Sequence, residues 1–328
     1  MKLAALGIQL PLLPTMAANS LPKSPDLIEL RYKVAKGIQL SAELDRKERL
    51  AAEIWIRQQE RISVDVLVDG EMSRSDMIAH FARKVDGFDP GGLVRVYGNR
   101  YYRKPVIRSK LEWKTPVVAD VWKFCQRMTH RPVKAVVTGP ATLVDWSFNE
   151  HYATREEALK DATVVLRREL TALAEAGAKI VQIDEHALSS RPEDFEMVAA
   201  ALRELTAGFK FYFILHHAYG ELGPVIGKVL GLPVDQISLE ATNSNFTLLP
   251  AVKKFGTKKD LSFGLVDSHS RVIETPAIVK QRLRAVLSAV PASQLWLTSD
   301  SGLRTRTADE AVGKLKALVQ AAVKERAS

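Results

Sequence analysis

Acidic side chains, histidines and serines directly follow apolar runs at several places along the chain. These residue types can bind cations, transfer protons or orient a substrate. The residues in question are Asp69, Glu71, Asp145, Trp146, Asp184, Glu185, His186, His216, His217, Glu240, Asp267, His269, Asp300 and Ser301. The carboxyl ends of parallel strands meet at one edge of a sheet, so we expect these side chains to form one active-site mouth.

Eight apolar runs alternate with helical patterns, as parallel strands joined by helices do. The runs are residues 12–16, 64–68, 134–138, 180–183, 211–215, 236–239, 262–266 and 294–298. The helical pattern of residues 153–177 ends at Gly177, which suits a helix C-terminal cap. The alternation predicts an α/β protein, a (β/α)8 TIM barrel, with residues 1–328 forming a single domain.

The chain of 328 residues is longer than the roughly 250 residues of a typical barrel. The surplus falls in two places: an N-terminal extension over residues 1–60, and a hairpin excursion at residues 85–115, after the second strand. The alternative, a doubly wound open sheet, is disfavoured because no G-x-G-x-x-G motif follows any of the runs.

Composition narrows the class of partner. No apolar run reaches the roughly 18 residues of a membrane span, and the N-terminus lacks a signal-peptide pattern, so we expect a cytoplasmic protein with no membrane partner. The net charge of +9 comes from scattered basic residues without interleaved aromatics, which argues against nucleic acid. The densest basic stretch, residues 95–114, is either a solvated hairpin or a surface for an anionic cofactor.

At the strand ends the sequence resembles the catalytic domain of cobalamin-independent methionine synthase, in its single-barrel form. The matching segments, in chain order, are LPTMAANSLPKSPDLIELR, VDVLVDGEMSRSDM, VVTGPATLVDWSF, IVQIDEHAL, ILHHAYGE, ISLEATNS, LVDSHS and LWLTSDSGLRTR. The resemblance implies a (β/α)8 barrel that moves a methyl group from methyltetrahydrofolate to homocysteine. In the family, zinc bound by one His, two Cys and one Glu holds the acceptor as a thiolate, because metal binding deprotonates a thiol.

Half of the zinc ligand set implied by the resemblance is present. His216 and Glu240 match the family's histidine and glutamate, whereas Ala218 and Ser301 stand where the two cysteines belong. The only cysteine, Cys125, lies in a helical pattern elsewhere. Alanine offers no ligand atom and a neutral hydroxyl is a poor zinc ligand, so we expect His216 and Glu240 to be a remnant that does not hold zinc tightly.

Other uses of these histidines stay open. A different metal site could combine His216 and Glu240 with His186 or His217, since two histidines and a carboxylate suit a non-haem metal. Alternatively, His216 is a core histidine hydrogen-bonded to Glu240. His186 stands where the family usually has proline.

The resemblance also assigns residues to the amino acid substrate. Glu71 and Asp184 match acidic residues that bind this substrate, and Glu185 is grouped with Asp184. Ser20 matches a serine that touches the substrate carboxylate, although Asn19 replaces the glycine before it. Two carboxylates facing one pocket need a cation or a shared proton, and an ammonium group supplies it.

The folate side of the reaction has its own candidates. Trp146 matches a tryptophan that stacks near the folate ring, and Asp145 is grouped with it as cofactor-binding. Asp267 and His269 match a D-x-H-S motif whose histidine protonates the folate nitrogen as the methyl leaves. We therefore expect His269, oriented by Asp267, to be the general acid.

The sequence predicts a methyl or one-carbon transferase with tetrahydrofolate or methyltetrahydrofolate as substrate, working without zinc–thiolate chemistry. One alternative is a folate-independent lyase or hydrolase that uses His216, His217 and Glu240 as acid and base. Another is a non-catalytic binding or accessory protein. Pterin binding separates the first interpretation from the second, and any turnover separates both from the third.

Overall fold

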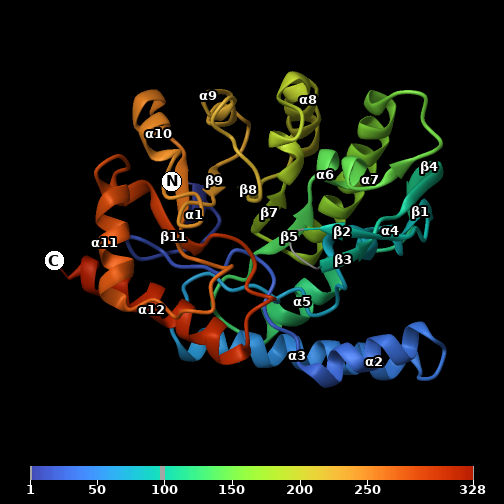
Figure 1. The fold of residues 1–328 in the computed structure, drawn as a ribbon, viewed down its shortest axis with the longest axis horizontal. Helices are drawn as coiled ribbons and strands as arrows, with labels where there is room; N and C mark the ends of the chain where they lie inside the picture. The colour runs from blue at the N-terminus through green and yellow to red at the C-terminus, as the bar shows by residue number, and fades with distance from the viewer. Residues whose placement is uncertain (1, 97–99, 328) are drawn as a thin grey trace. The chain divides into compact units, whose positions relative to one another are not determined.

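The computed structural model describes residues 2–96 and 100–327 (Figure 1). The chain divides into two compact units. Unit 1 consists of Met1–Ser73, Val121–Lys134 and Gln236–Ser328. Unit 2 consists of Arg74–Asp120 and Ala135–Asp235.

Unit 2 contains parallel strands joined by helices, together with a group of shorter strands. Its elements are α4 (Met77–Ala82), β1 (Val85–Asp89), β2 (Leu93–Val96), β3 (Arg100–Arg103), β4 (Val106–Trp113), β5 (Ala135–Thr138), α6 (Pro140–Asp145), β6 (Phe148–Asn149), α7 (Arg155–Ala176), β7 (Ile180–Asp184), η1 (His186–Ser189), η2 (Pro192–Asp194), α8 (Phe195–Thr206), β8 (Tyr212–His217) and α9 (Ile226–Val229).

Strands β5, β7 and β8 pair in parallel, and helices α7 and α8 pack against each other beside them (Figure 1). Every residue of β7 is buried, as expected for a strand covered on both faces. Thr154 and Glu157 form a capping box at the start of α7, and Gly177 ends this helix in the left-handed conformation at φ 92°. The predicted helix end at Gly177 is confirmed.

The predicted hairpin excursion is also confirmed. β1 pairs antiparallel with β4. β2 pairs antiparallel with β3 inside the same excursion. The excursion is thus one hairpin nested within another.

Unit 1 holds helices from both ends of the chain and the last three strands, and α5 (Ala119–Arg127) crosses from unit 2 into unit 1. Its elements are α1 (Lys2–Ala5), α2 (Pro25–Ala35), α3 (Ser41–Arg61), β9 (Gln236–Leu239), α10 (Leu249–Phe255), β10 (Asp260–Val266), α11 (Pro276–Leu287), η3 (Ala292–Gln294), β11 (Leu295–Ser299) and α12 (Ala308–Arg326). β10 pairs in parallel with both β9 and β11, and α12 packs on α11, β10 and β11.

Six of the eight expected strands are confirmed, whereas residues 12–16 and 64–68 form only single parallel bridges. These bridges join Thr15 to Leu297, Met16 to Val66 and Leu67 to Val133. Backbone hydrogen bonds remain at these bridges, such as Met16 N–H to the Leu297 carbonyl at 3.0 Å and Leu67 N–H to the Pro132 carbonyl at 2.9 Å, and side chains add to them. Asp65 accepts the Thr15 N–H at 2.8 Å, and Gln59 bonds both the N–H and the carbonyl of Val68 at 3.1 and 2.8 Å. These two segments therefore run as expected, held by isolated backbone bridges and by side-chain hydrogen bonds.

The only cysteine of the chain, Cys125, lies on α5 (Ala119–Arg127) and is fully buried. Burial raises the pKa of its thiol far above the usual range. None of the helices in residues 2–96 and 100–327 combines the length and the apolar character of a membrane span.

Candidate functional site

The polar strand ends of unit 2 lie side by side. Thr138 at the end of β5 pairs with Asp184 at the end of β7, and Asp184 pairs with His216 on β8. Asp184 is buried, and Gln182 donates to its Oδ1 at 2.6 Å. The parallel register thus brings three of the strand-end polar positions together, as the sequence predicted for this part of the chain.

Three buried histidines gather at these ends, and we call His186, His216 and His217 the histidine cluster. The ring centroids of His186 and His216 lie 5.6 Å apart in an edge-on contact, and those of His186 and His217 lie 6.2 Å apart. All three are nearly inaccessible to solvent. His216 and His217, adjacent in the sequence, therefore both lie beside the ring of His186.

Hydrogen bonds fix the tautomers of two members of the cluster. The Ala218 N–H donates to Nδ1 of His186 at 3.1 Å, so the proton of this neutral ring is on Nε2. Nδ1 of His217 lies 3.1 Å from the carbonyl oxygen of Glu185, so it donates and leaves the lone pair on Nε2. Burial, and next the nearby His217, lower the pKa of His186 to about 3, so the ring is neutral at physiological pH.

Aromatic rings flank His186. Trp146, at the end of α6, stacks on it at 5.7 Å between centroids with an interplanar angle of 23°. The Tyr219 ring meets His186 at 5.3 Å, and 50% of the Tyr219 surface is exposed. Trp146 thus stacks on an imidazole ring of the protein, and its predicted contact with the folate ring stays a prediction. Tyr219 was not singled out from the sequence, although it directly follows the HHA segment.

Glu185 and Asp145 are engaged by protein donors. The Glu185 carboxylate accepts the backbone N–H groups of Ala141 at 3.0 Å and Thr142 at 2.6 Å at the start of α6. A Cβ on Gly139 would lie 2.3 Å from this carboxylate, so only glycine permits the approach. Burial raises the pKa of Glu185 to about 7. Asp145 receives two 2.8 Å bonds from Arg155. These two candidates hold the local structure.

In unit 1 the predicted Ser20 lies next to the segment that carries Ser301. The Leu303 N–H donates to the Ser20 carbonyl at 2.7 Å. A Cβ on Gly302 would lie 2.1 Å from Ser20 Oγ, which explains the glycine there. The Ser301 hydroxyl is bonded to Ser268 Oγ at 2.6 Å. Two motifs that are far apart in the sequence are therefore neighbours.

Glu71 has a strained backbone. Its φ is +58°, in the left-handed region that non-glycine residues rarely adopt, and its side chain is buried. Its N–H donates to Asp69 Oδ1 at 3.1 Å. Strained residues of this kind cluster at ligand sites, which agrees with the predicted role of Glu71.

Lys23 is a buried cation that the sequence reasoning missed. Burial, and next the charge of Arg304, lower its pKa to about 7, while Glu71 and Asp69 oppose the shift. The available signal was its position in ANSLPKSP, three residues after Ser20.

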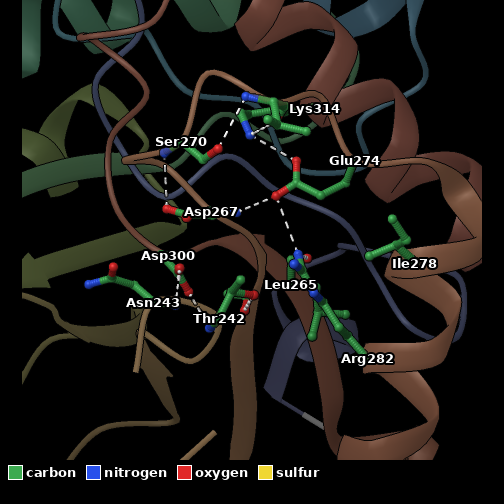
Figure 2. Close-up of polar contacts among 12 residues, drawn as sticks. Thr242, Asn243, Leu265, Asp267, Ser270, Glu274, Ile278, Arg282, Asp300 and Lys314 are labelled. Carbon is green, nitrogen blue, oxygen red and sulfur yellow. Dashed lines mark hydrogen bonds and ion pairs between the residues drawn. The ribbon is translucent and has the colours of Figure 1, made fainter. Parts of the chain in front are cut away.

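The Asp267–His269 segment is held mainly through its backbone. Oδ1 of Asp267 accepts the N–H of His269 at 2.7 Å and that of Ser270 at 3.2 Å. The Asp267 N–H in turn donates to Glu274 Oε1 at 2.7 Å (Figure 2). Asp267 thus positions the main chain of His269.

Glu274 organises this loop. Figure 2 shows its carboxylate between Asp267, Lys314 and Arg282. Lys314 Nζ lies 2.8 Å from Oε2, and Arg282 Nη1 lies 3.3 Å from Oε1 and 2.8 Å from the Leu265 carbonyl. The Lys314 side chain is fully buried.

Asp300 organises the loop that follows Glu240. Its carboxylate accepts the N–H groups of Ala241, Thr242 and Asn243, each at 2.8 Å (Figure 2). Burial raises the pKa of Asp300 to about 7, against these hydrogen bonds. Asn243 Nδ2 donates to Glu240 Oε1 at 2.5 Å.

The donor set does not match a zinc–thiolate centre. Position 218 has only a methyl side chain, and the Ser301 hydroxyl already bonds Ser268. Among residues 2–96 and 100–327, no three His, Cys, Asp or Glu side chains are arranged to hold a metal ion. The residues present therefore do not fit the zinc site that the resemblance implies.

Residues 13–324 match the family model described as the cobalamin-independent synthase catalytic domain. The chain belongs to this family. It is 34% identical to a methionine synthase of Saccharolobus solfataricus over 314 residues, which is 95% of this chain and 94% of that protein. It is 35% identical to a methionine synthase of Thermococcus kodakarensis, covering 90% of this chain and 88% of the relative.

Solved structures agree with this assignment. A B12-independent methionine synthase from Shewanella, solved in complex with selenomethionine, matches with a TM-score of 0.86 at 25% identity, covering 97% of this chain and 98% of that one. A methionine synthase from Listeria monocytogenes, with the same B12-independent description, shares the fold at a TM-score of 0.80 and 22% identity, covering 97% and 99%. These matches confirm the predicted fold class, the α/β barrel of the family. They also confirm the predicted enzyme class, a methyltransferase of the cobalamin-independent methionine synthase family.

Proposed function

We propose that this chain transfers a methyl or other one-carbon group between a folate-type partner and a small nucleophile, without zinc–thiolate chemistry. The observation that carries the proposal is the family match over residues 13–324 in a chain that retains the acidic and imidazole strand ends. A Synechococcus relative, 34% identical over 96% of this chain and 43% of its own length, is named 5-methyltetrahydropteroyltriglutamate–homocysteine methyltransferase.

The amino acid side of the reaction falls to three residues. Glu71 and Asp184 bind the substrate ammonium, since a buried carboxylate needs a cation or a proton. Ser20 contacts the substrate carboxylate through its hydroxyl. The Shewanella structure with selenomethionine supports a site for a sulfur-type amino acid or its selenium analogue in this family.

The folate side falls to Trp146 and His269. Trp146 offers an aromatic face to the pterin ring. As the methyl carbon leaves the folate nitrogen for the lone pair of the nucleophile, that nitrogen gains the electron pair of the broken bond and takes a proton from the His269 imidazolium, which becomes neutral imidazole. Asp267 keeps His269 in place through its backbone N–H.

We further propose that residues 1–328 act as one catalytic domain in the cytoplasm, with small molecules rather than nucleic acid or membrane as partners. The family match over nearly the whole chain supports the single functional domain. The scattered distribution of the 47 Lys and Arg residues supports the absence of a nucleic-acid surface.

Calorimetric titration with tetrahydrofolate and methyltetrahydrofolate tests the folate partner, and transfer of isotopically labelled methyl to homocysteine and other thiols tests the reaction. We expect binding below millimolar, and zinc well below one equivalent per purified chain because both thiolate ligands are absent. No heat of binding at millimolar folate would contradict the transferase and favour the folate-independent lyase or hydrolase. Tightly held stoichiometric zinc would contradict the ligand argument.

A further inference from the structure

The His186 ring has a buried nitrogen that takes no part in the hydrogen bonds of the histidine cluster. Nε2 of His186 is inaccessible to solvent and has no hydrogen-bond partner among the described residues. The Ala218 N–H occupies Nδ1 of the same ring, so Nε2 carries the proton. A buried N–H without an acceptor is unfavourable, and such groups need an explanation in the function of the protein.

The surroundings of His186 are aromatic and partly open. Trp146 stacks on one side of the ring, and Tyr219, with 50% of its surface exposed, meets it edge-on. A planar ligand that contacts either ring would bring its own edge close to the imidazole. Heteroaromatic rings such as pterins have carbonyl oxygens and ring nitrogens on that edge, and both accept hydrogen bonds.

The backbone of position 218 fixes the orientation of the His186 ring. The Ala218 N–H donates to Nδ1 at 3.1 Å, and the alanine side chain at this position offers no polar atom of its own. Nε2 is therefore the one ring nitrogen of His186 that can donate to a ligand.

We propose that His186 is a specificity-determining residue whose Nε2–H donates to an acceptor atom on the edge of the ring of the folate-type partner. The inference rests on the proposed function and names a protein group that recognises that partner. It also excludes neutral His186 as a replacement metal ligand through Nε2, because that nitrogen has no lone pair in this tautomer.

Two variants separate the donor from the ring. His186→Phe keeps an aromatic ring for Trp146 and removes both nitrogens, whereas His186→Gln restores an N–H donor near the position of Nε2. The exposed His130→Asn serves as the matched control. Circular dichroism and thermal melts confirm folding of each variant.

Calorimetric titration of the full chain with tetrahydrofolate and, separately, with L-homocysteine gives the main readout. We expect His186→Phe to bind tetrahydrofolate about tenfold more weakly, the loss of one hydrogen bond to a buried donor, with His186→Gln recovering most of it. In turnover, KM for the folate should rise with little change in kcat. Homocysteine affinity should stay within twofold of wild type.

Each other outcome counts against the proposal. Tetrahydrofolate binding by His186→Phe within twofold of wild type would mean that Nε2–H makes no hydrogen bond to the folate. Loss of homocysteine affinity instead would overturn the assignment to the folate. Nitrogen-15 NMR of unliganded wild type that shows the Nδ1–H tautomer would overturn the geometry itself. Failure of wild type to bind tetrahydrofolate would overturn the proposed function as well, which distinguishes the two failures.

Discussion

The carboxylate loops of unit 1 and the histidine cluster of unit 2 are held by different kinds of contact. Asp300 accepts three backbone N–H groups, and Glu274 bonds one backbone N–H and two cationic side chains. The His186 ring accepts one hydrogen bond, from the Ala218 N–H, and otherwise makes ring contacts. Groups saturated by protein donors hold the loops, whereas we propose that the remaining N–H donor of His186 binds a ligand.

Candidate residues within unit 2 also differ in whether protein groups already bond their side chains. Glu185 and His186 are adjacent in the sequence, yet the Glu185 carboxylate is used at the start of α6. The hydrogen bonds that a group already makes therefore say more about its role than its place in a motif does.

The largest effect is expected from removing Glu274, the carboxylate that bonds Asp267, Lys314 and Arg282 in unit 1. Glu274→Ala leaves the buried Lys314 ammonium without its counter-charge, and we expect it to lower the free energy of unfolding by about 3–5 kcal/mol. Urea unfolding measures the change. Glu196→Ala is the control, because Glu196 forms an exposed pair with Lys228 and should change stability by less than about 0.5 kcal/mol. Equal effects of the two variants would show that the network does not hold the loop.

In the described part of the chain, Lys23, also in unit 1, is a buried lysine without an ion pair like that of Lys314 and Glu274. Its pKa falls from 10.5 to about 7 on folding, so between these pH values the unfolded chain binds more protons than the folded one. The penalty is full below pH 7 and disappears as the pH rises to 10.5. Lys23→Met should therefore be more stable than wild type near pH 7, by up to about 3 kcal/mol, with the difference vanishing toward pH 10.5.

Chemical unfolding of both proteins across this pH range measures the difference. The exposed Lys210→Met is the control and should show no such pH dependence. A difference between Lys23→Met and wild type that stays constant with pH would show that Lys23 is protonated in both states.

Glu71 belongs to unit 1 and Asp184 to unit 2, and we propose substrate binding for both. We expect Glu71→Gln and Asp184→Asn each to lower kcat/KM about 30-fold, roughly 2 kcal/mol, because the lost charge binds the substrate ammonium. Melting temperatures should stay near that of wild type. A large fall in melting temperature with normal kinetics would make either residue structural.

Trp146→Ala should have the smallest effect. Aromatic stacking contributes on the order of 1 kcal/mol, so tetrahydrofolate binding should weaken about fivefold in calorimetric titration. Trp146→Phe, which keeps an aromatic face, should recover most of the affinity. Unchanged affinity in the alanine variant would show that Trp146 serves only to pack His186.

The sequence predicted what depends on short-range pattern. Periodicity located six of the strands, and Gly177 marked a helix end correctly. It could not show that Gln59 and Asp65 would take the hydrogen bonds of two expected strands, because polar side chains give no sign of their partners.

The candidate site divides in the same way. Motif order indicated which residues lie at the strand ends, including Asp184 and His216. The tautomer of His186 depends on the Ala218 backbone 32 residues away, and Glu274 meets Lys314 across 40 residues. Contacts between such distant positions follow from tertiary packing, which one sequence does not encode in any local pattern.

The burial of Cys125 makes the native chain equivalent to a cysteine-free protein for thiol chemistry. Thiol-labelling reagents react with the thiolate form. The Cys125 thiol is buried, and its raised pKa keeps it protonated. A cysteine introduced at any exposed position would then be the single site of labelling. Pairs of such cysteines within one unit could carry spin labels or fluorophores and report distances inside that unit during turnover, with no native cysteine removed.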